Sequence, residues 1–132
     1  MKLLSFHHTG VLVKSIDDSI AFYSVLFGKE SISDIINISS QKVKVCFVEI
    51  SVGTYLELVE PVGTESVVFG LLKKKVSYYH IGYKIRDIEQ GVKVLEELNF
   101  KPLEYFFSEA FGNKRCIFLF SPDSSLIELI EE

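Results

Sequence analysis

Tryptophan is absent from this sequence of 132 residues, and cysteine, proline and methionine are scarce, with two, three and one copies. Two cysteines cannot build a disulfide-rich secreted fold, so we expect Cys46 and Cys116 to be buried free thiols. The sequence also lacks an apolar run long enough to span a bilayer, and its apolar start is too short for a signal peptide. We therefore expect a soluble cytoplasmic protein with no membrane partner.

The sequence also has fewer basic than acidic residues. It contains 14 Lys and Arg residues and 18 Asp and Glu residues, which gives a net charge of −4. Proteins that bind nucleic acid need a basic face for the phosphates, so we do not expect nucleic acid as a partner. A run of three lysines, residues 73–75, is the exception. We interpret it as a solvated helix end, with a clamp for a phosphate-bearing substrate as the alternative.

Apolar residues, by contrast, make up 48% of the chain, and 13% of the residues are aromatic. A chain of this size and composition can bury a real core, and no segment resembles a disordered linker. Residues 1–132 are therefore predicted to form a single domain.

Two stretches that lie 72 residues apart are alike. Residues 8–18 and residues 80–90 each begin with His-x-Gly and continue with β-branched and other apolar residues, a pattern that predicts a strand. Each then reaches a helix-capping pair, Ser15 with Asp18 and Asp87 with Gln90. A repeat at a fixed offset indicates that the chain is built from two similar modules.

A second pair of stretches keeps nearly the same offset. Residues 55–61 match residues 126–131, which places Glu57 and Glu128 71 residues apart. Each half thus has a histidine at the start of its first strand and a glutamate in its last strand.

The hydrophobic periodicity predicts the same element order in both halves, strand-helix-strand-strand-strand, with a short helix at 65–75 between them. Gly28 is expected to end the first helix, and residues 111–113 are expected to form a mobile loop. The predicted strands are 3–14, 30–38, 42–50, 54–60, 77–86, 102–107, 114–120 and 125–131, and the main helices are 16–27 and 88–98.

Paired modules with His-x-Gly strands and a late Ile-Glu-Leu strand resemble the vicinal oxygen chelate superfamily, which includes glyoxalase I, methylmalonyl-CoA epimerase and bleomycin resistance proteins. The resemblance covers nearly the whole chain, with module one at about 1–62 and module two at about 76–132. It implies an α+β fold in which two tandem βαβββ modules form a curved mixed sheet, a cup around a metal site. A homodimer is also expected.

Carried over residue by residue, the resemblance implies that one divalent ion is bound by His8, Glu57, His80 and Glu128. The chemistry of the strands agrees, because a carboxylate on so apolar a strand must be paired, protonated or bound to metal. Two imidazoles and two carboxylates suit zinc, nickel, cobalt, manganese or iron(II). His7 alternates away from His8 and is predicted not to be a ligand.

The resemblance also implies chemistry at a carbonyl or thioester substrate. The metal acts as a Lewis acid while a base, for which Glu128 is the candidate, removes the proton α to the carbonyl. Aromatic residues are expected to line the cup and contact the substrate, namely Phe47, Tyr55, Tyr83 and Phe118.

Within the superfamily, residues 41–48 followed by 56–61 resemble the methylmalonyl-CoA epimerase pattern. The sequence departs from that pattern at Val45, where some epimerases carry a second carboxylate and for which Glu49 is a weak substitute. A glyoxalase I-type lactoylglutathione lyase is the first alternative, since residues 121–124 partly match its turn. A non-enzymatic binding or resistance protein of the same fold is the second, and retention of all four candidate ligands argues against it.

Overall fold

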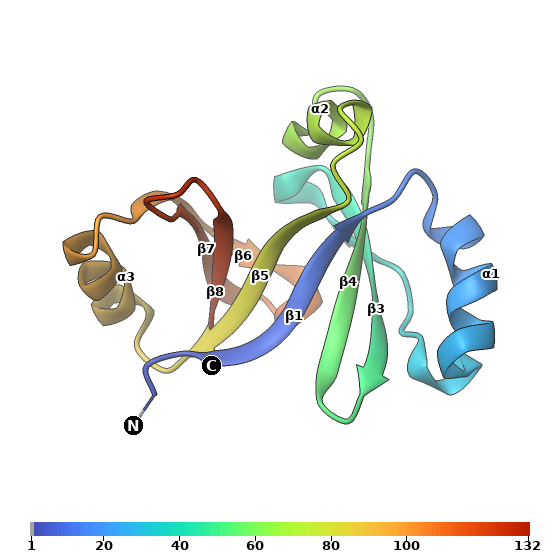
Figure 1. Ribbon diagram of the computed structural model, residues 1–132, viewed down its shortest axis with the longest axis horizontal. Coiled ribbons are helices and arrows are strands. Elements are labelled where there is room, and N and C mark those ends of the chain that lie inside the picture. Colours follow the sequence, from blue (N-terminus) through green and yellow to red (C-terminus); the bar gives the residue numbers. More distant parts are fainter. Residues whose placement is uncertain (1) are drawn as a thin grey trace.

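All eight strands join one curved mixed sheet in the computed structural model, which describes residues 2–132 (Figure 1). Met1, the first residue of the predicted module one, lies outside the described residues. The first half contains β1 (Ser5–Leu12), α1 (Ile16–Phe27), β2 (Ile36–Ile38), β3 (Val43–Ser51) and β4 (Thr54–Pro61). After α2 (Val67–Lys73), the second half contains β5 (Tyr78–Ile85), α3 (Ile88–Glu97), β6 (Lys101–Ser108), β7 (Lys114–Phe120) and β8 (Leu126–Glu131).

The two halves meet through their first strands. The strand order is β2-β3-β4-β1-β5-β8-β7-β6, so β1 and β5 lie side by side at the centre of the sheet and run antiparallel (Figure 1). Each of them also pairs in parallel with the last strand of its own half, β1 with β4 and β5 with β8. The α+β fold with two βαβββ modules and a curved mixed sheet, which the family resemblance implied, is confirmed.

Each long helix packs on the outer face of its own half. Helix α1 covers a cluster that includes Val11, Cys46 and Leu58, whereas α3 covers one that includes Ile117 and Leu129. The predicted caps are present, since Ser15 Oγ accepts the Asp18 amide at 3.2 Å and Asp87 Oδ1 accepts the Gln90 amide at 3.1 Å. Such caps satisfy amides that have no partner within the helix.

Two expectations need correction. The predicted strand at 30–38 is mostly not a strand, because a 3₁₀ turn occupies Lys29–Ser31, Ile32 makes a single bridge to β3, and Ile36–Ile38 forms the strand that pairs with β3. The loop expected at 111–113 begins inside another 3₁₀ turn, Glu109–Phe111. Among residues 2–132, no helix combines the length and the apolar character needed to cross a membrane.

Candidate metal centre

Strand pairing brings the repeated histidines and glutamates into one cluster. His8 lies on β1 opposite Gly82 of β5, and Gly82 in turn lies opposite Glu128 of β8. The mirror arrangement places His80 opposite Gly10, which lies opposite Glu57 of β4. The four side chains therefore reach one point from the four central strands, and all four are buried, with His8 fully inaccessible.

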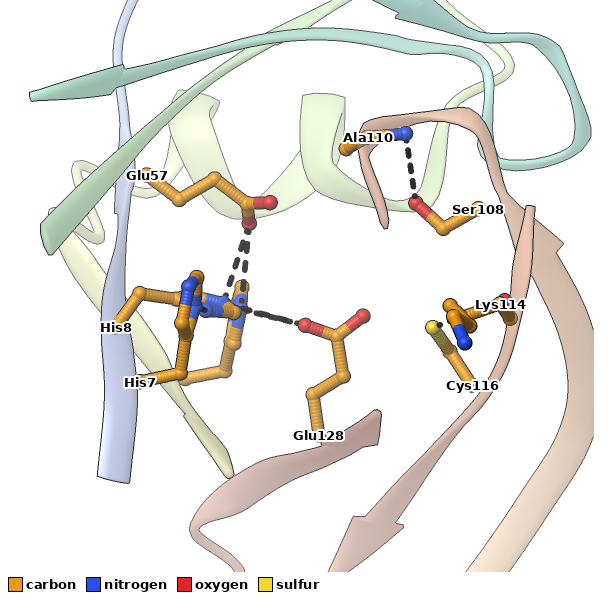
Figure 2. Close-up of polar contacts among 9 residues, drawn as sticks. His7, His8, Glu57, Ser108, Ala110, Lys114, Cys116 and Glu128 are labelled. Atoms are coloured by element: carbon orange, nitrogen blue, oxygen red, sulfur yellow. Dashed lines mark hydrogen bonds and ion pairs between the residues drawn. The ribbon is translucent and has the colours of Figure 1, made fainter. Parts of the chain in front are cut away.

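The donor atoms of these side chains converge. The two Nε2 atoms of His8 and His80 are 2.9 Å apart, and the Oε1 atoms of the glutamates lie 3.2–3.5 Å from them. In Figure 2, the carboxylates of Glu57 and Glu128 approach the imidazoles from different strands, and the second oxygen of Glu128 points away from them. Two glutamates and two histidines thus offer four donors to one position.

The cluster fits a divalent metal ion. Neighbouring donors that share an ion at about 2.0–2.2 Å lie about 3.0–3.5 Å apart, which is the spacing seen here. The Oε1 atom of Glu128 is buried and has no hydrogen-bond partner among residues 2–132, although it faces the cluster. A buried carboxylate oxygen in that state is costly unless a cation meets it. Mixed nitrogen and oxygen donors suit first-row transition metals.

The glycine of each His-x-Gly motif makes room for the histidine of the other copy. A methyl group on Gly10 would overlap the imidazole of His80, and one on Gly82 would overlap the imidazole of His8. Glycine inside a strand is otherwise unfavourable and marks a close approach of another group. The motif therefore encodes two linked features, a ligand in one strand and space for the partner ligand in the adjacent strand.

The close approach of imidazoles and carboxylates shifts the pKa values of the cluster. Burial lowers the pKa of His80, but the nearby carboxylates of Glu128 and Glu57 outweigh burial and raise it to about 9. Burial raises the pKa of Glu128, but the nearby imidazoles of His8 and His80 reverse the effect and lower it. In the absence of a cation, a protonated His80 therefore lies beside two carboxylates.

The prediction that His7 points away from His8 is wrong. A register irregularity between Phe6 and His8 in the β1–β5 pairing interrupts strict alternation. His7 Nδ1 consequently lies 2.9 Å from His8 Nδ1. Burial, followed by the nearby His8 and Lys84, lowers the pKa of His7 to about 4, so its imidazole is neutral at physiological pH.

When His8 acts as a metal ligand, it needs a hydrogen-bond acceptor for its other ring nitrogen, and a neutral His7 provides one. If Nε2 of His8 faces a cation, the Nδ1 atom of His8 carries the proton. That N–H then donates a hydrogen bond to Nδ1 of His7. His80 has no such support, because its Nδ1 has no hydrogen-bond partner among the described residues. The counterpart of His7 in the second half is Tyr79, whose ring packs edge-on against His80 at a centroid distance of 4.4 Å.

A cavity of about 920 Å³ opens beside the cluster. Glu57, His80 and Glu128 form part of its wall, and most of the remaining wall is apolar. Two of the aromatic residues expected at the substrate, Tyr83 and Phe118, line this cavity. The apolar lining also includes Val43, Val45, Val59, Leu71, Leu103 and Phe106.

The other two expected aromatic residues lie around the histidines. Tyr55 stacks on His7 at 5.1 Å between ring centroids, and Phe47 meets His8 edge-on at 6.0 Å. Phe111, which was not among the four expected aromatic contacts, stacks on His8 at 5.8 Å between ring centroids. Its position after β6 gave no periodic pattern, so nothing in the sequence connected it with the first strand.

Lysines around β3 and α2 differ in whether an acidic side chain lies beside them. Lys42 Nζ lies 2.9 Å from Glu65 Oε2, and Lys44 Nζ lies 3.6 Å from Glu60 Oε2, so carboxylates offset both charges. Lys74, at the end of α2, lines the cavity.

Comparisons with known proteins agree on one family. Residues 7–120 match the model described as Glyoxalase/Bleomycin resistance protein/Dioxygenase superfamily. The mitochondrial methylmalonyl-CoA epimerase of mouse is 26% identical over 132 residues, covering 97% of this chain and 73% of that protein. A hypothetical protein of Bacillus halodurans has a TM-score of 0.83 at 26% identity, covering 99% of this chain and 96% of that chain. Streptomyces coelicolor methylmalonyl-CoA epimerase, in complex with 2-nitronate-propionyl-CoA, has the same fold, with a TM-score of 0.83, 24% identity and 99% of each chain covered.

Proposed function

The chain belongs to the glyoxalase/bleomycin resistance protein/dioxygenase superfamily, and from this premise we propose that it is a divalent-metal-dependent isomerase that epimerises an acyl-CoA thioester. The observation that carries the proposal is the convergence of four buried donors, three of which form part of the wall of a large apolar cavity. The similarity to methylmalonyl-CoA epimerases supports methylmalonyl-CoA, or a close relative of it, as the substrate.

His8, Glu57, His80 and Glu128 would hold one ion of zinc, nickel, cobalt, manganese or iron(II). The bound ion supplies Lewis acidity that polarises the substrate carbonyl and makes the neighbouring C–H bond more acidic.

Glu128 is the proposed base. Its Oε1 faces the imidazoles, whereas its second oxygen points away from them (Figure 2) and is free to accept the α-proton. Return of a proton to the opposite face of the same carbon gives the epimer. The apolar wall around Phe106 and Phe118 excludes water, which protects the carbanionic character that develops at this carbon.

The cavity edge offers a place for the coenzyme. Lys74 is exposed where the cavity opens beside α2, and its ammonium group is suited to a coenzyme A phosphate. Binding energy from this remote group helps to orient the small acyl group at the metal.

The test is deuterium exchange in heavy water with metal-loaded protein and methylmalonyl-CoA. We expect exchange at the α-carbon by the native protein and a loss of at least about 100-fold in Glu128→Gln, which cannot accept the proton. Glu131→Gln is the matched control, because Glu131 lies on the same strand but bonds to Arg115 on β7. An unchanged exchange rate in Glu128→Gln contradicts the assignment of the base.

A glyoxalase I-type lyase is the second candidate, and one observation favours it. Val45 lines the cavity where some epimerases carry a further carboxylate, so Glu57 and Glu128 are the acidic residues of the described cavity wall. A single mobile base that returns the proton to the neighbouring carbon would give a glyoxalase product. Turnover of the methylglyoxal–glutathione hemithioacetal, without exchange into methylmalonyl-CoA, would favour this candidate. Metal binding without either reaction would favour the binding-protein alternative.

A further inference from the structure

A second cavity, of about 450 Å³, lies beside α2 and shares no lining residue with the larger cavity among residues 2–132. Helix α2 contributes to the two cavities through different faces. Phe69, Leu72 and Lys73, which are three and four residues apart, line the small cavity. Another face, which includes Lys74, lines the large one. We call the small cavity the α2 pocket, and the described residues of its wall are Lys14, Pro61, Gly63, Thr64, Phe69, Leu72 and Lys73.

The parallel pairing of β1 and β4 brings Lys14 to the α2 pocket. The two strands pair up to Leu12 and Val59, and the amide of Val13 then donates to the carbonyl of Val59 at 2.9 Å. Lys14 and Pro61 are each two residues further along, so they lie close together at the same end of the sheet. The segment after Pro61 leads into α2. The α2 pocket therefore forms between the ends of two paired strands and one helix.

The positive charge of the α2 pocket has no acidic partner. Its described wall contains the ammonium groups of Lys14 and Lys73 and no carboxylate. Within residues 2–132, neither lysine takes part in an ion pair. The chain as a whole has a net charge of −4, so the pocket differs in sign from the rest of the protein. Two cations that converge on one concave site favour an anionic ligand.

The acidic residues that flank the segment between β4 and α2 are engaged elsewhere. Glu60 Oε1 accepts the amide of Ile16 at 2.8 Å, and Glu60 Oε2 lies 3.6 Å from Lys44 Nζ. Glu65 Oε2 lies 2.9 Å from Lys42 Nζ. Both carboxylates therefore have partners outside the pocket wall, and the charges of the two pocket lysines remain available to a ligand.

Uncharged groups of the α2 pocket suit an organic phosphate. Thr64 adds a hydroxyl group, which can donate to a phosphate oxygen. Pro61, Phe69 and Leu72 give the wall an apolar part. Lys73 Nζ lies 5.8 Å from the centroid of the Phe69 ring, so positive charge and an aromatic surface are adjacent. A ligand that carries both a phosphate and an apolar or flat group would contact both parts.

We propose that the α2 pocket binds the phosphate group of a phosphate monoester, with Lys14 and Lys73 as cationic contacts and Thr64 as a hydrogen-bond donor. A phosphate monoester carries a charge of about −1.5 to −2 at neutral pH, which matches two ammonium groups. Two carriers present this group, a free nucleotide and the ribose end of coenzyme A. The coenzyme as carrier rests on the proposed function, whereas binding at the pocket requires no turnover.

The first experiment titrates adenosine 3′,5′-bisphosphate into the protein by calorimetry, at low ionic strength and with a chelator that keeps metal from the cluster. The native protein should bind one equivalent. Lys14→Gln and Lys73→Gln should each weaken binding about 10-fold, because each removes one charged contact. Lys75→Gln is the matched control, since it removes the same charge from the same lysine run at a residue outside both described walls. Its affinity should stay within about twofold of native.

Melting curves show whether each variant is folded. The absence of binding by the native protein overturns the proposal. Equal losses in Lys14→Gln, Lys73→Gln and Lys75→Gln also overturn it, because they would show a general effect of net charge. A loss in Lys74→Gln without a loss in Lys14→Gln would place the phosphate in the large cavity, and this result too contradicts the proposal.

The second experiment identifies the carrier through the KM of proton exchange with methylmalonyl-CoA. If the phosphate of the coenzyme occupies the α2 pocket, Lys14→Gln and Lys73→Gln should raise KM by about 10-fold and change kcat less. The thioester of 3′-dephospho-coenzyme A should then have the same KM with native and variant proteins. If a free nucleotide is the carrier, the variants should keep the native KM, and adenosine 3′,5′-bisphosphate should bind equally well with saturating thioester present. Absence of exchange in every protein would contradict the proposed function, whereas the phosphate site is decided by calorimetry alone.

Discussion

Replacing Gly82 with alanine should destroy metal binding while leaving the fold largely intact. The added methyl group would occupy space that the imidazole of His8 fills, and three atoms of that ring would be too close to it. Backbone movement is unfavourable, because Gly82 lies in the central strand β5 with β1 and β8 paired on either side. The ring of His8 must therefore move.

The size of the effect follows from the displacement. To restore ordinary contact with the methyl group, the ring must shift by more than about 1 Å, whereas metal ligands tolerate about 0.2 Å. A displacement of about 1 Å in a positioned group costs about 100-fold, so we expect metal affinity to fall by at least that factor, about 2.7 kcal/mol. The overpacking should destabilise the metal-free fold by about 1–3 kcal/mol.

The assay is competition for zinc with a chromophoric chelator, together with denaturant unfolding of the metal-free protein. Gly91→Ala is the matched control, because its methyl group would overlap the terminal carbon of Ile85, in the α3 core away from the cluster. Gly91→Ala should change stability and leave zinc affinity within about twofold. Native zinc affinity in Gly82→Ala would refute the reasoning. Gly10→Ala should reproduce the loss through His80.

Three further predictions concern His7, the two cysteines and His80. His7→Phe should weaken zinc binding about 10–100-fold, since it removes the acceptor for His8, while His7→Asn keeps an acceptor and should bind nearly as the native protein does. Burial raises the pKa of Cys46 and Cys116, so neither thiol should react with an alkylating agent until the protein unfolds, as mass spectrometry can show. In chelator, the raised pKa of His80, about 9, stabilises the fold below pH about 6.5 and loses this contribution as pH rises through 9, so Tm should fall over that range and His80→Gln should flatten the fall.

The fold was predictable because two independent patterns repeated at nearly one offset. Strand and helix periodicities located the long elements, and α1 matches its predicted range of 16–27. The prediction of a strand over 30–38 was mostly wrong, because local β-branched composition does not decide whether a partner strand is available. Ile36–Ile38 forms a strand against β3, Ile32 makes a single bridge to β3, and the 3₁₀ turn that follows α1 occupies the start of the region. Tertiary pairing overrode local propensity there.

The donor residues of the candidate site were predictable from the sequence. The neighbouring residues that hold the donors in place were not. The family resemblance implied His8, Glu57, His80 and Glu128 as ligands, and the repeat and the apolar strands around the glutamates agreed with it. The contact between His7 and His8 depends on a bulge, which no simple alternation rule anticipates. The purpose of Gly10 and Gly82 was likewise hidden, because it depends on which strands become neighbours.

Positions at which the two halves carry different residues indicate where the halves contribute differently to the site. Where the halves agree, at the His-x-Gly strands and the late glutamates, they build one shared cluster that neither half contains alone. Where the halves differ, the difference changes the surroundings of the histidine in one half and not in the other. His7 supports His8, whereas Tyr79 leaves Nδ1 of His80 without a hydrogen-bond partner among the described residues. Because a ligand without that support holds a metal less firmly, we expect His7→Phe to remove the main difference between the two imidazoles, and zinc-loaded protein should then show similar exchange broadening for both rings by NMR. Persistently different broadening in His7→Phe would show that the asymmetry of the site lies elsewhere.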